Sequence, residues 1–137
     1  MSPSRPLPTL IGVTENALRA LLVRTLSLTS IPGYAAWVIL NAMSTAAPAD
    51  SWRETVADSL KASPAEIDAT LAELRTIGLI GNEEALTPAG TAELAAARKA
   101  VSGATLPLIE GIDEAEQAAA RRVLDAIRLR AEESLNA

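Results

Sequence analysis

The chain has 137 residues, of which 49% are hydrophobic and 21% are charged, and its formal net charge is −5. A domain near this size buries roughly two-thirds of the surface that its unfolded chain exposes, so a hydrophobic core can form without covalent or metal cross-links. The sequence contains no His and no Cys, which excludes His-assisted nucleophiles, disulfides and the common zinc sites. We therefore expect no catalytic residue, no bound metal and no cofactor.

A membrane span and a secretory signal are not expected either. The longest apolar-rich run, residues 35–47, is interrupted by Asn41 and Ser44 and is shorter than the about 20 residues that a transmembrane helix needs. The first residues lack the basic, apolar and small-residue order of a secretory signal. The sequence therefore favours a cytoplasmic protein that does not enter the membrane.

Two helices are predicted in the first third of the chain. After a proline-rich arm, apolar residues at three- and four-residue spacing predict a long amphipathic helix from about Leu10 to Leu26. Pro32 stands where a second helix would take a first-turn proline. This second helix, from about Pro32 to Ala42, is apolar nearly all round, so we expect it to be the buried central helix.

The middle of the chain carries the pattern of a helix-turn-helix. Ser51 with Glu54, and Ser63 with Glu66, match the S-x-x-E capping box that opens a helix. Gly78 supplies a left-handed stop after the second of these helices. Two capped helices that follow each other this closely predict a short, well-defined turn between them.

A minimal β-hairpin is predicted directly after this stop, between Leu79 and Leu86, with strands of two or three residues. Thr87 and Pro88 then start a fifth helix, which is interrupted or bent near residues 102–107. The order of helix, turn, helix and hairpin is that of a winged helix-turn-helix, and such domains normally bind DNA.

The last helix has an apolar stripe that a monomer of this size does not cover. Asp113 and Glu116 match a further capping box. The apolar positions after it recur every fourth residue, which is typical of one helix face. We infer a partner helix, and the residues expected at the resulting dimer interface are Val123, Ile127, Ala131 and Leu135.

The chain resembles the MarR family of bacterial transcription regulators in two short motifs and in the order of its elements. The motifs are the L-x-x-x-G-L-I run, Leu74–Ile80, and the LTPAG run, Leu86–Gly90. The order places one helix before the winged domain and two helices after it. The resemblance covers nearly the whole chain.

This resemblance implies a mainly α fold in a single domain, residues 1–137. A winged helix-turn-helix with a small β-hairpin would occupy about residues 30–90, flanked by dimerisation helices at about 8–27 and 88–137. It also implies a homodimer that regulates transcription by binding double-stranded operator DNA. The candidate DNA-contact residues are the basic and polar residues of the helix-turn-helix: Arg53, Lys61, Ser63, Thr70 and Arg75.

The charge of the fourth helix leaves a second interpretation open. This helix carries Glu66, Asp68 and Glu73 against the single Arg75, and residues 81–85 of the hairpin contain no basic residue. Backbone N–H groups at helix starts can hold phosphates without a charged side chain. The alternative is a winged-helix protein–protein interaction module that does not bind DNA.

A small-molecule effector is a further implication of the resemblance, in a pocket where the dimerisation and DNA-binding parts meet. The candidate ligand residues in the central helix are Tyr34, Trp37 and Met43, with Arg19 or Arg24 as the candidate anchor for an anionic ligand. Ordinary core packing would explain the same aromatic residues.

Overall fold

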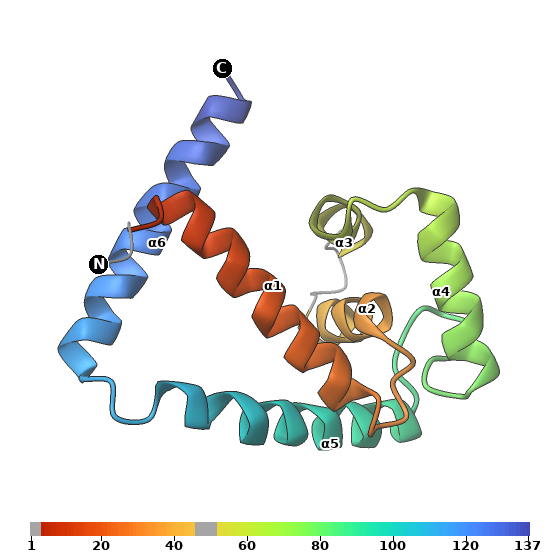
Figure 1. The fold of residues 1–137 in the computed structure, drawn as a ribbon. Helices are drawn as coiled ribbons and strands as arrows, with labels where there is room; N and C mark the ends of the chain where they lie inside the picture. The colour runs from red at the N-terminus through yellow and green to blue at the C-terminus, as the bar shows by residue number, and fades with distance from the viewer. Residues whose placement is uncertain (1–3, 46–51) are drawn as a thin grey trace. The chain divides into compact units, whose positions relative to one another are not determined.

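A computed structural model describes residues 4–45 and 52–137 of the chain. The helices in this part are α1 (Leu7–Leu26), α2 (Tyr34–Thr45), α3 (Trp52–Leu60), α4 (Pro64–Thr76), α5 (Pro88–Thr105), the 3-10 helix η1 (Leu106–Ile109) and α6 (Glu114–Leu135) (Figure 1). They belong to two compact units, Met1–Ala104 and Thr105–Ala137. The prediction of a mainly helical fold is confirmed.

The core of the first unit is built around α2, which packs against α1, α3 and α4. The prediction that this helix is the central one is therefore confirmed. All buried residues of the described chain are apolar or small: Leu26, Ile31, Ala36, Ile39, Leu40, Val56, Ile67, Leu71, Leu74, Leu79, Ile80, Gly90, Leu94 and Ala97. No helix in residues 4–45 and 52–137 is long and apolar enough to cross a membrane.

Side-chain hydrogen bonds join α5 to α2. Arg98 Nε donates to Asn41 Oδ1 at 2.9 Å, and Arg98 Nη2 donates to Ser44 Oγ at 2.6 Å. Asn41 itself donates from Nδ2 to the carbonyl of Trp37, one turn earlier in α2. The two polar residues that interrupt the apolar run of α2 thus bind the neighbouring helix.

The starts of the first two helices differ from the prediction. Pro6 is the N-cap of α1, and a second proline lies in its first turn, where prolines are tolerated because those N–H groups have no helical partner. α1 therefore begins three residues earlier than Leu10. Placing Pro32 in the first turn of α2 was wrong: Ile31 is buried in the core, and the chain turns into the helix only at Gly33, whose carbonyl accepts from Trp37 N.

The capping box at the start of α4 is confirmed. Glu66 N donates to Ser63 Oγ, and Ser63 N donates to Glu66 Oε1, both at 3.2 Å. Pro64 occupies the first helical position, where its missing N–H costs nothing. Ser51, the other predicted N-cap, lies outside the described residues, so the box that it was expected to form with Glu54 is not described.

Helices α3 and α4 both end in a left-handed residue. Lys61 has φ 54° and Gly78 has φ +83°. The residue after each donates its N–H back into the helix, from Ala62 N to Ala57 O at 3.1 Å and from Leu79 N to Leu74 O at 3.0 Å, the pattern of a Schellman motif. The predicted stop at Gly78 is confirmed, and the same geometry at Lys61 forms the turn of the helix-turn-helix.

The segment 79–87, called the wing below, is shorter than a regular hairpin. Ile80 and Leu86 form a single antiparallel bridge, which is flanked by hydrogen bonds from Gly81 N to Ala85 O and from Thr87 N to Leu79 O. The described residues contain no longer strand. The predicted hairpin is thus reduced to one bridge, because the turn begins as soon as Gly81 is reached.

Thr87 and Gly90 fix the wing to the start of α5. Thr87 Oγ1 donates to Gly78 O at 2.6 Å and accepts from Gly90 N at 3.0 Å. A Cβ at Gly90 would lie 1.9 Å from the carbonyl oxygen of Leu79, so only glycine allows this approach. The LTPAG run is therefore a packing motif between the wing and α5.

In the second unit, η1 leads into α6. The interruption predicted near residues 102–107 occurs at Thr105, where α5 ends and the Pro107-containing η1 begins. Asp113 caps α6 by accepting from Ala115 N at 3.2 Å. The reciprocal bond predicted from Glu116 is not formed in the described structure, so Asp113 acts as a simple cap.

Candidate nucleic-acid interface

The candidate interface consists of α3, the turn at Lys61, α4 and the wing, all within the first unit. Ile67, Leu71 and Leu74 are buried on one side of α4. Because residues three and four apart share a helix face, the opposite side of α4 is left toward solvent. This exposed side is the surface that could enter a groove of DNA.

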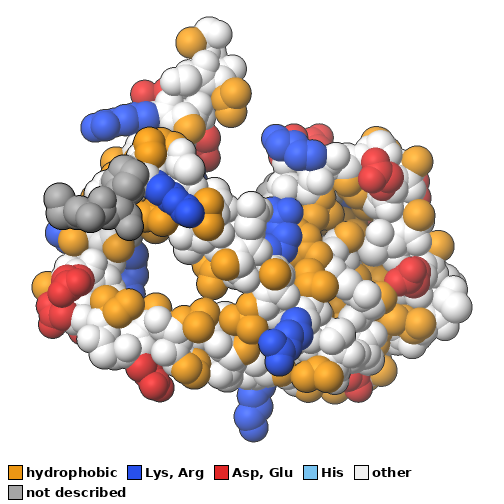
Figure 2. Space-filling view, in the orientation of Figure 1, with side chains coloured by type: hydrophobic (Ala, Val, Ile, Leu, Met, Phe, Trp, Pro, Cys, Tyr) orange, Lys and Arg blue, Asp and Glu red, His pale blue; other side chains and the backbone are white. Residues whose placement is uncertain are grey.

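The exposed side of α4 combines small and acidic side chains. Its exposed residues after Pro64 are Ala65, Glu66, Asp68, Ala69, Ala72, Glu73 and Thr76. In Figure 2, the charged side chains seen over α4 are acidic. Residues 52–87 as a whole contain three basic and seven acidic residues, so phosphate binding here depends on how the three basic residues are used.

Arg53 of α3 is held between α4 and the wing. Arg53 Nη1 lies 3.0 Å from Asp68 Oδ1, and Arg53 Nε donates to Glu84 Oε2 at 3.3 Å. Arg53 Nη2 also donates to Glu84 Oε1, and the guanidinium carbon lies 5.6 Å from the ring centroid of Trp52. We call Arg53, Asp68 and Glu84 the Arg53 clamp.

The clamp changes the electrostatics of its own members. Hydrogen bonding to Arg53, opposed in part by desolvation, lowers the pKa of the Glu84 carboxyl. The hydrogen bonds from Glu84 and then Asp68 raise the pKa of Arg53, which is charged at any physiological pH in either case. The Arg53 and Glu84 side chains are 38% and 33% exposed, so water screens the pair and its contribution to stability is modest.

Arg75 also points toward the wing. Its Nε donates to the carbonyl of Gly81 at 3.3 Å, and its side chain is half-buried. Arg75 thus connects the last turn of α4 to the turn of the wing. Two of the three basic residues of the interface bind the wing in this structure.

The other three predicted DNA-contact residues lie at the turn and along α4. Lys61 is exposed in the turn, and no ion pair involves it among the described residues. Ser63 accepts from the backbone of Glu66 as the cap of α4. Thr70 is half-buried and donates to the carbonyl of Glu66 at 3.2 Å. Lys61 is therefore the basic residue best placed to reach a phosphate.

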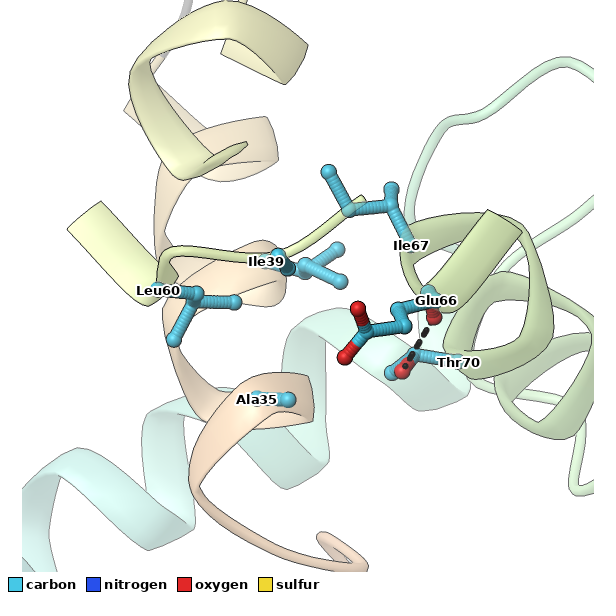
Figure 3. Close-up of a pocket in the computed structure, with 7 residues that line it drawn as sticks. Ala35, Ile39, Leu60, Glu66, Ile67 and Thr70 are labelled. Atoms are coloured by element: carbon cyan, nitrogen blue, oxygen red, sulfur yellow. Dashed lines mark hydrogen bonds between the residues drawn. The ribbon is translucent and has the colours of Figure 1, made fainter. Parts of the chain in front are cut away.

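A cavity of about 170 Å³ lies between α2, the end of α3 and the start of α4, and is lined by Ala35, Ile39, Leu60, Ala62, Glu66, Ile67 and Thr70. Figure 3 shows the Glu66 side chain reaching from α4 toward α2, beside the hydrogen bond from Thr70 to the Glu66 carbonyl. The lining is mostly aliphatic. None of the candidate ligand residues named from the sequence, Arg19, Arg24, Tyr34, Trp37 and Met43, is part of the lining.

The predicted ligand residues are distributed over α1 and α2. The Arg19 guanidinium lies 5.0 Å from the centroid of the Tyr34 ring, and Arg19 Nε donates to Glu15 Oε1 at 2.8 Å. Trp37 and Met43 are half-buried and pack against the core. The structure thus brings Arg19 and Tyr34 together, whereas Trp37 and Met43 have packing roles.

The contacts of Asp68 and Glu84 with Arg53 were not predicted from the sequence. The three residues lie on α4, the wing and α3, and the pairs are separated by 15 and 31 residues in the chain. No helical or strand spacing links positions so far apart. The sequence offered one signal of such pairing, the excess of carboxylates over basic residues in residues 52–87. This excess does not indicate which carboxylate pairs with which arginine.

The second unit exposes the stripe that was expected to meet a partner helix. Within the described chain, α6 has no buried residue. Val123 is 46% and Leu135 is 84% exposed, while Ile127 is half-buried and Ala131 is exposed. In the first unit, α1 likewise exposes Leu10.

The described residues contain no group of carboxylates that could hold a metal ion.

The described helices, with a capped helix after a tight turn and a short wing beside it, define a winged helix-turn-helix protein. No protein-family model and no curated protein sequence matches the chain. The solved structure of transcriptional regulator PA3341 is similar, with 26% identity, a TM-score of 0.76, and coverage of 93% of this chain and 99% of that one.

Two further solved structures carry the family name. A MarR-family transcriptional regulator from Rhodococcus sp. RHA1 has 22% identity and a TM-score of 0.72 over 93% of this chain and 98% of its own. The Mycobacterium tuberculosis MarR-family protein Rv2887 in complex with DNA has 21% identity and a TM-score of 0.73 over 90% and 98%. Rv2887 has also been solved with salicylic acid. The fold of this chain is that of MarR-like winged-helix transcriptional regulators.

Proposed function

We propose that this protein is a DNA-binding transcriptional regulator that acts as a homodimer. The observation that carries the proposal is the exposed face of α4, which is capped at Ser63 and packed on α2 and α3. The same fold is present in Rv2887, which was solved with DNA. In helix-turn-helix proteins the second helix of the motif enters the major groove.

The residues of α4 suit close approach to bases better than strong attraction to phosphates. Ala65, Ala69 and Ala72 are exposed, and alanine methyl groups make apolar contacts with the methyl group of thymine. An exposed carboxylate such as that of Glu73 can accept from the amino group of cytosine. Backbone N–H groups in the first turn of α4 add phosphate contacts that need no cation.

Dimerisation would place two copies of α4 on one DNA duplex. The exposed apolar residues of α6, among them Val123 and Leu135, support a second copy of this chain as their partner. Two-fold related helices read half-sites about 34 Å apart, one helical turn of DNA. We therefore expect a pseudo-palindromic operator.

The salt dependence of the affinity for DNA tests this proposal. A labelled duplex carrying the sequence upstream of the protein's own gene would be titrated by fluorescence anisotropy at several salt concentrations. A regulator should bind, and its affinity should fall steeply with salt because binding releases counterions. The absence of binding even at low salt would contradict the proposal.

A pair of single-charge variants locates the binding face. Lys61→Gln should weaken all DNA sequences alike and reduce the slope of log affinity against log salt by about 0.9. Lys99→Gln removes the same charge from an exposed position of α5 and should leave both quantities nearly unchanged. If the two variants changed the affinity and the slope equally, the DNA would not bind at the turn that contains Lys61.

A small carboxylate effector is a second part of the proposal. Its support is the Arg19–Tyr34 contact, together with the salicylic acid complex of Rv2887. The chain has two Trp residues, so in a Trp52→Phe variant the fluorescence reports on Trp37 alone. Salicylate should change this fluorescence saturably, and Arg19→Gln should weaken the response; no change in either protein would exclude this ligand at α2.

One observation favours a different function. Arg53 is paired with two carboxylates, and the exposed residues of α4 after Pro64 include Glu66, Asp68 and Glu73 but no Lys or Arg. A protein partner with a basic surface would suit this face. The salt titration separates the two functions, because a protein-interaction module would leave the duplex unbound at every salt concentration.

A further inference from the structure

We propose that Asp68 and Glu84 set the DNA affinity of this protein by holding Arg53 away from the phosphate backbone. The inference rests on the proposed function, because it concerns the strength of DNA binding at the same surface. It concerns residues on three elements: α3, α4 and the wing. Arg53 would become a phosphate contact only when the Arg53 clamp opens.

The geometry of the clamp engages Arg53 from two sides. Nη1 faces Asp68 at 3.0 Å, whereas Nε and Nη2 face the two oxygens of Glu84. Two-point pairing of a guanidinium with a carboxylate is the geometry that Arg would otherwise use on a phosphate. Glu84 thus occupies the donors through which Arg53 would bind DNA.

The net charge of the Arg53 clamp also opposes phosphate binding. One guanidinium paired with two carboxylates leaves a net negative group at the surface between α4 and the wing. A DNA phosphate that approaches this group is repelled until a carboxylate is displaced or neutralised. Trp52, whose ring lies 5.6 Å from the guanidinium, further favours the closed position of Arg53 through a cation–π contact.

Glu83 provides a matched control on the same turn. It is exposed and directly precedes Glu84, and no ion pair involves it among the described residues. Glu83→Gln and Glu84→Gln remove the same charge at nearly the same distance from DNA. A difference between these two variants therefore reports on the release of Arg53 and not on general charge.

The experiment measures the affinity of a labelled duplex from upstream of the protein's own gene, and of a scrambled duplex of equal length, over a range of salt. Glu84→Gln should bind both duplexes more tightly than Glu83→Gln does. Glu84→Gln combined with Asp68→Asn should extend this gain to roughly tenfold at about 0.1 M salt, with a slope steeper by about 0.9, as for one added phosphate contact. Glu83→Gln should change the affinity less and leave the slope almost unchanged.

The Arg53→Ala background separates the clamp from simple charge removal. In this background, Glu84→Gln and Glu83→Gln should have equal, small effects. The inference is overturned if Glu84→Gln resembles Glu83→Gln in the native background, or if its gain persists without Arg53. Loss of all DNA binding in every variant would instead overturn the proposed function.

A second measurement examines the clamp without DNA. The Arg53 Nε–H signal in a nitrogen–proton correlation spectrum should be protected from exchange in the native protein. Glu84→Gln should shift this signal and expose it to exchange, whereas Glu83→Gln should not. An Arg53 signal that exchanges rapidly in the native protein would overturn the clamp even if the chain binds DNA.

Discussion

Gly90 shows how one missing side chain allows two elements to meet. Its Cα lies against the backbone of Leu79, and an added Cβ would lie 1.9 Å from a carbonyl oxygen and 2.8 Å from the carbonyl carbon. Neither backbone atom can move aside as a flexible side chain would. The residue between the wing and α5 is therefore glycine for packing reasons, within a helix where glycine otherwise costs stability.

We expect Gly90→Ala to lower the free energy of unfolding by about 3 kcal/mol or more, because the added methyl group overpacks a rigid contact. Gly103→Ala is the control: Gly103 lies in the same helix with nothing within 4 Å of its Cβ position. This control should gain about 0.5–1 kcal/mol from helix propensity. Urea denaturation followed by circular dichroism measures both changes, and a stable Gly90→Ala protein would refute the packing argument.

Lys61 is the opposite case, because it has a side chain in a backbone conformation that glycine adopts at lower energy. Its φ of 54° is a left-handed conformation that costs an ordinary residue roughly 1–2 kcal/mol. Lys61→Gly should therefore raise the free energy of unfolding by about 0.5 kcal/mol after the added freedom of the unfolded chain is subtracted. Lys61→Ala should not raise it, and equal stabilities of the two variants would show that the turn is not strained.

At the scale of elements, local signals predicted more than long-range ones. The capping box at Ser63 and the stop at Gly78 were predictable because every atom involved lies within a few residues. The central position of α2 followed from its apolar surface. The hairpin was predicted with longer strands than the single bridge of the wing. The pairing of Arg53 with Glu84 was not predictable, since it depends on how two segments 31 residues apart meet.

The ion pair between Arg53 and Glu84 of the wing makes the free energy of unfolding depend on pH. The pKa of Glu84 is lowered in the folded protein, chiefly by its hydrogen bonds to Arg53 and with a smaller contribution from Arg75, while Asp68 opposes the shift. A carboxyl with a lowered folded-state pKa stabilises the fold above its unfolded pKa of about 4.3. This contribution is lost as the pH falls through the lower, folded-state value.

We expect Glu84→Gln to lower the free energy of unfolding at pH 7 by about 0.2–1 kcal/mol, as for a partly exposed ion pair. The difference between native protein and variant should shrink below about pH 4 and disappear in stronger acid. Glu83→Gln removes a neighbouring carboxylate that has no ion pair among the described residues, and is the control for loss of charge alone. Denaturant titrations at several pH values provide the measurement, and a difference that stays constant with pH would contradict the pairing.

At the scale of the whole molecule, the two units differ in how much they bury. The first unit contains every buried residue of the described chain, whereas α6 contributes none. An amphipathic helix gains most of its stability from packing its apolar face. The second unit therefore depends on contacts that its own residues do not supply, in agreement with the proposed homodimer.

Ile127→Asp should break the proposed dimer, because a carboxylate would be buried without a partner at the apolar stripe. Analytical ultracentrifugation should then give half the native mass, or circular dichroism should show unfolding if the monomer is not stable alone. Leu129→Asp introduces the same charge on the opposite side of α6, at a residue that is 49% exposed, and should leave the mass unchanged. A native protein that sediments as a monomer would contradict the assignment.

The hydroxyl of Thr87 has a consequence for how a signal could cross the first unit. It bonds to Gly78 at the end of α4 and to Gly90 in the first turn of α5 with the same oxygen atom. Neither segment can shift alone without losing a hydrogen bond that stabilises the fold by about 1 kcal/mol. A rotation of α5 that keeps both bonds must therefore move the end of α4 with it, so this single oxygen couples the start of α5 to the candidate interface.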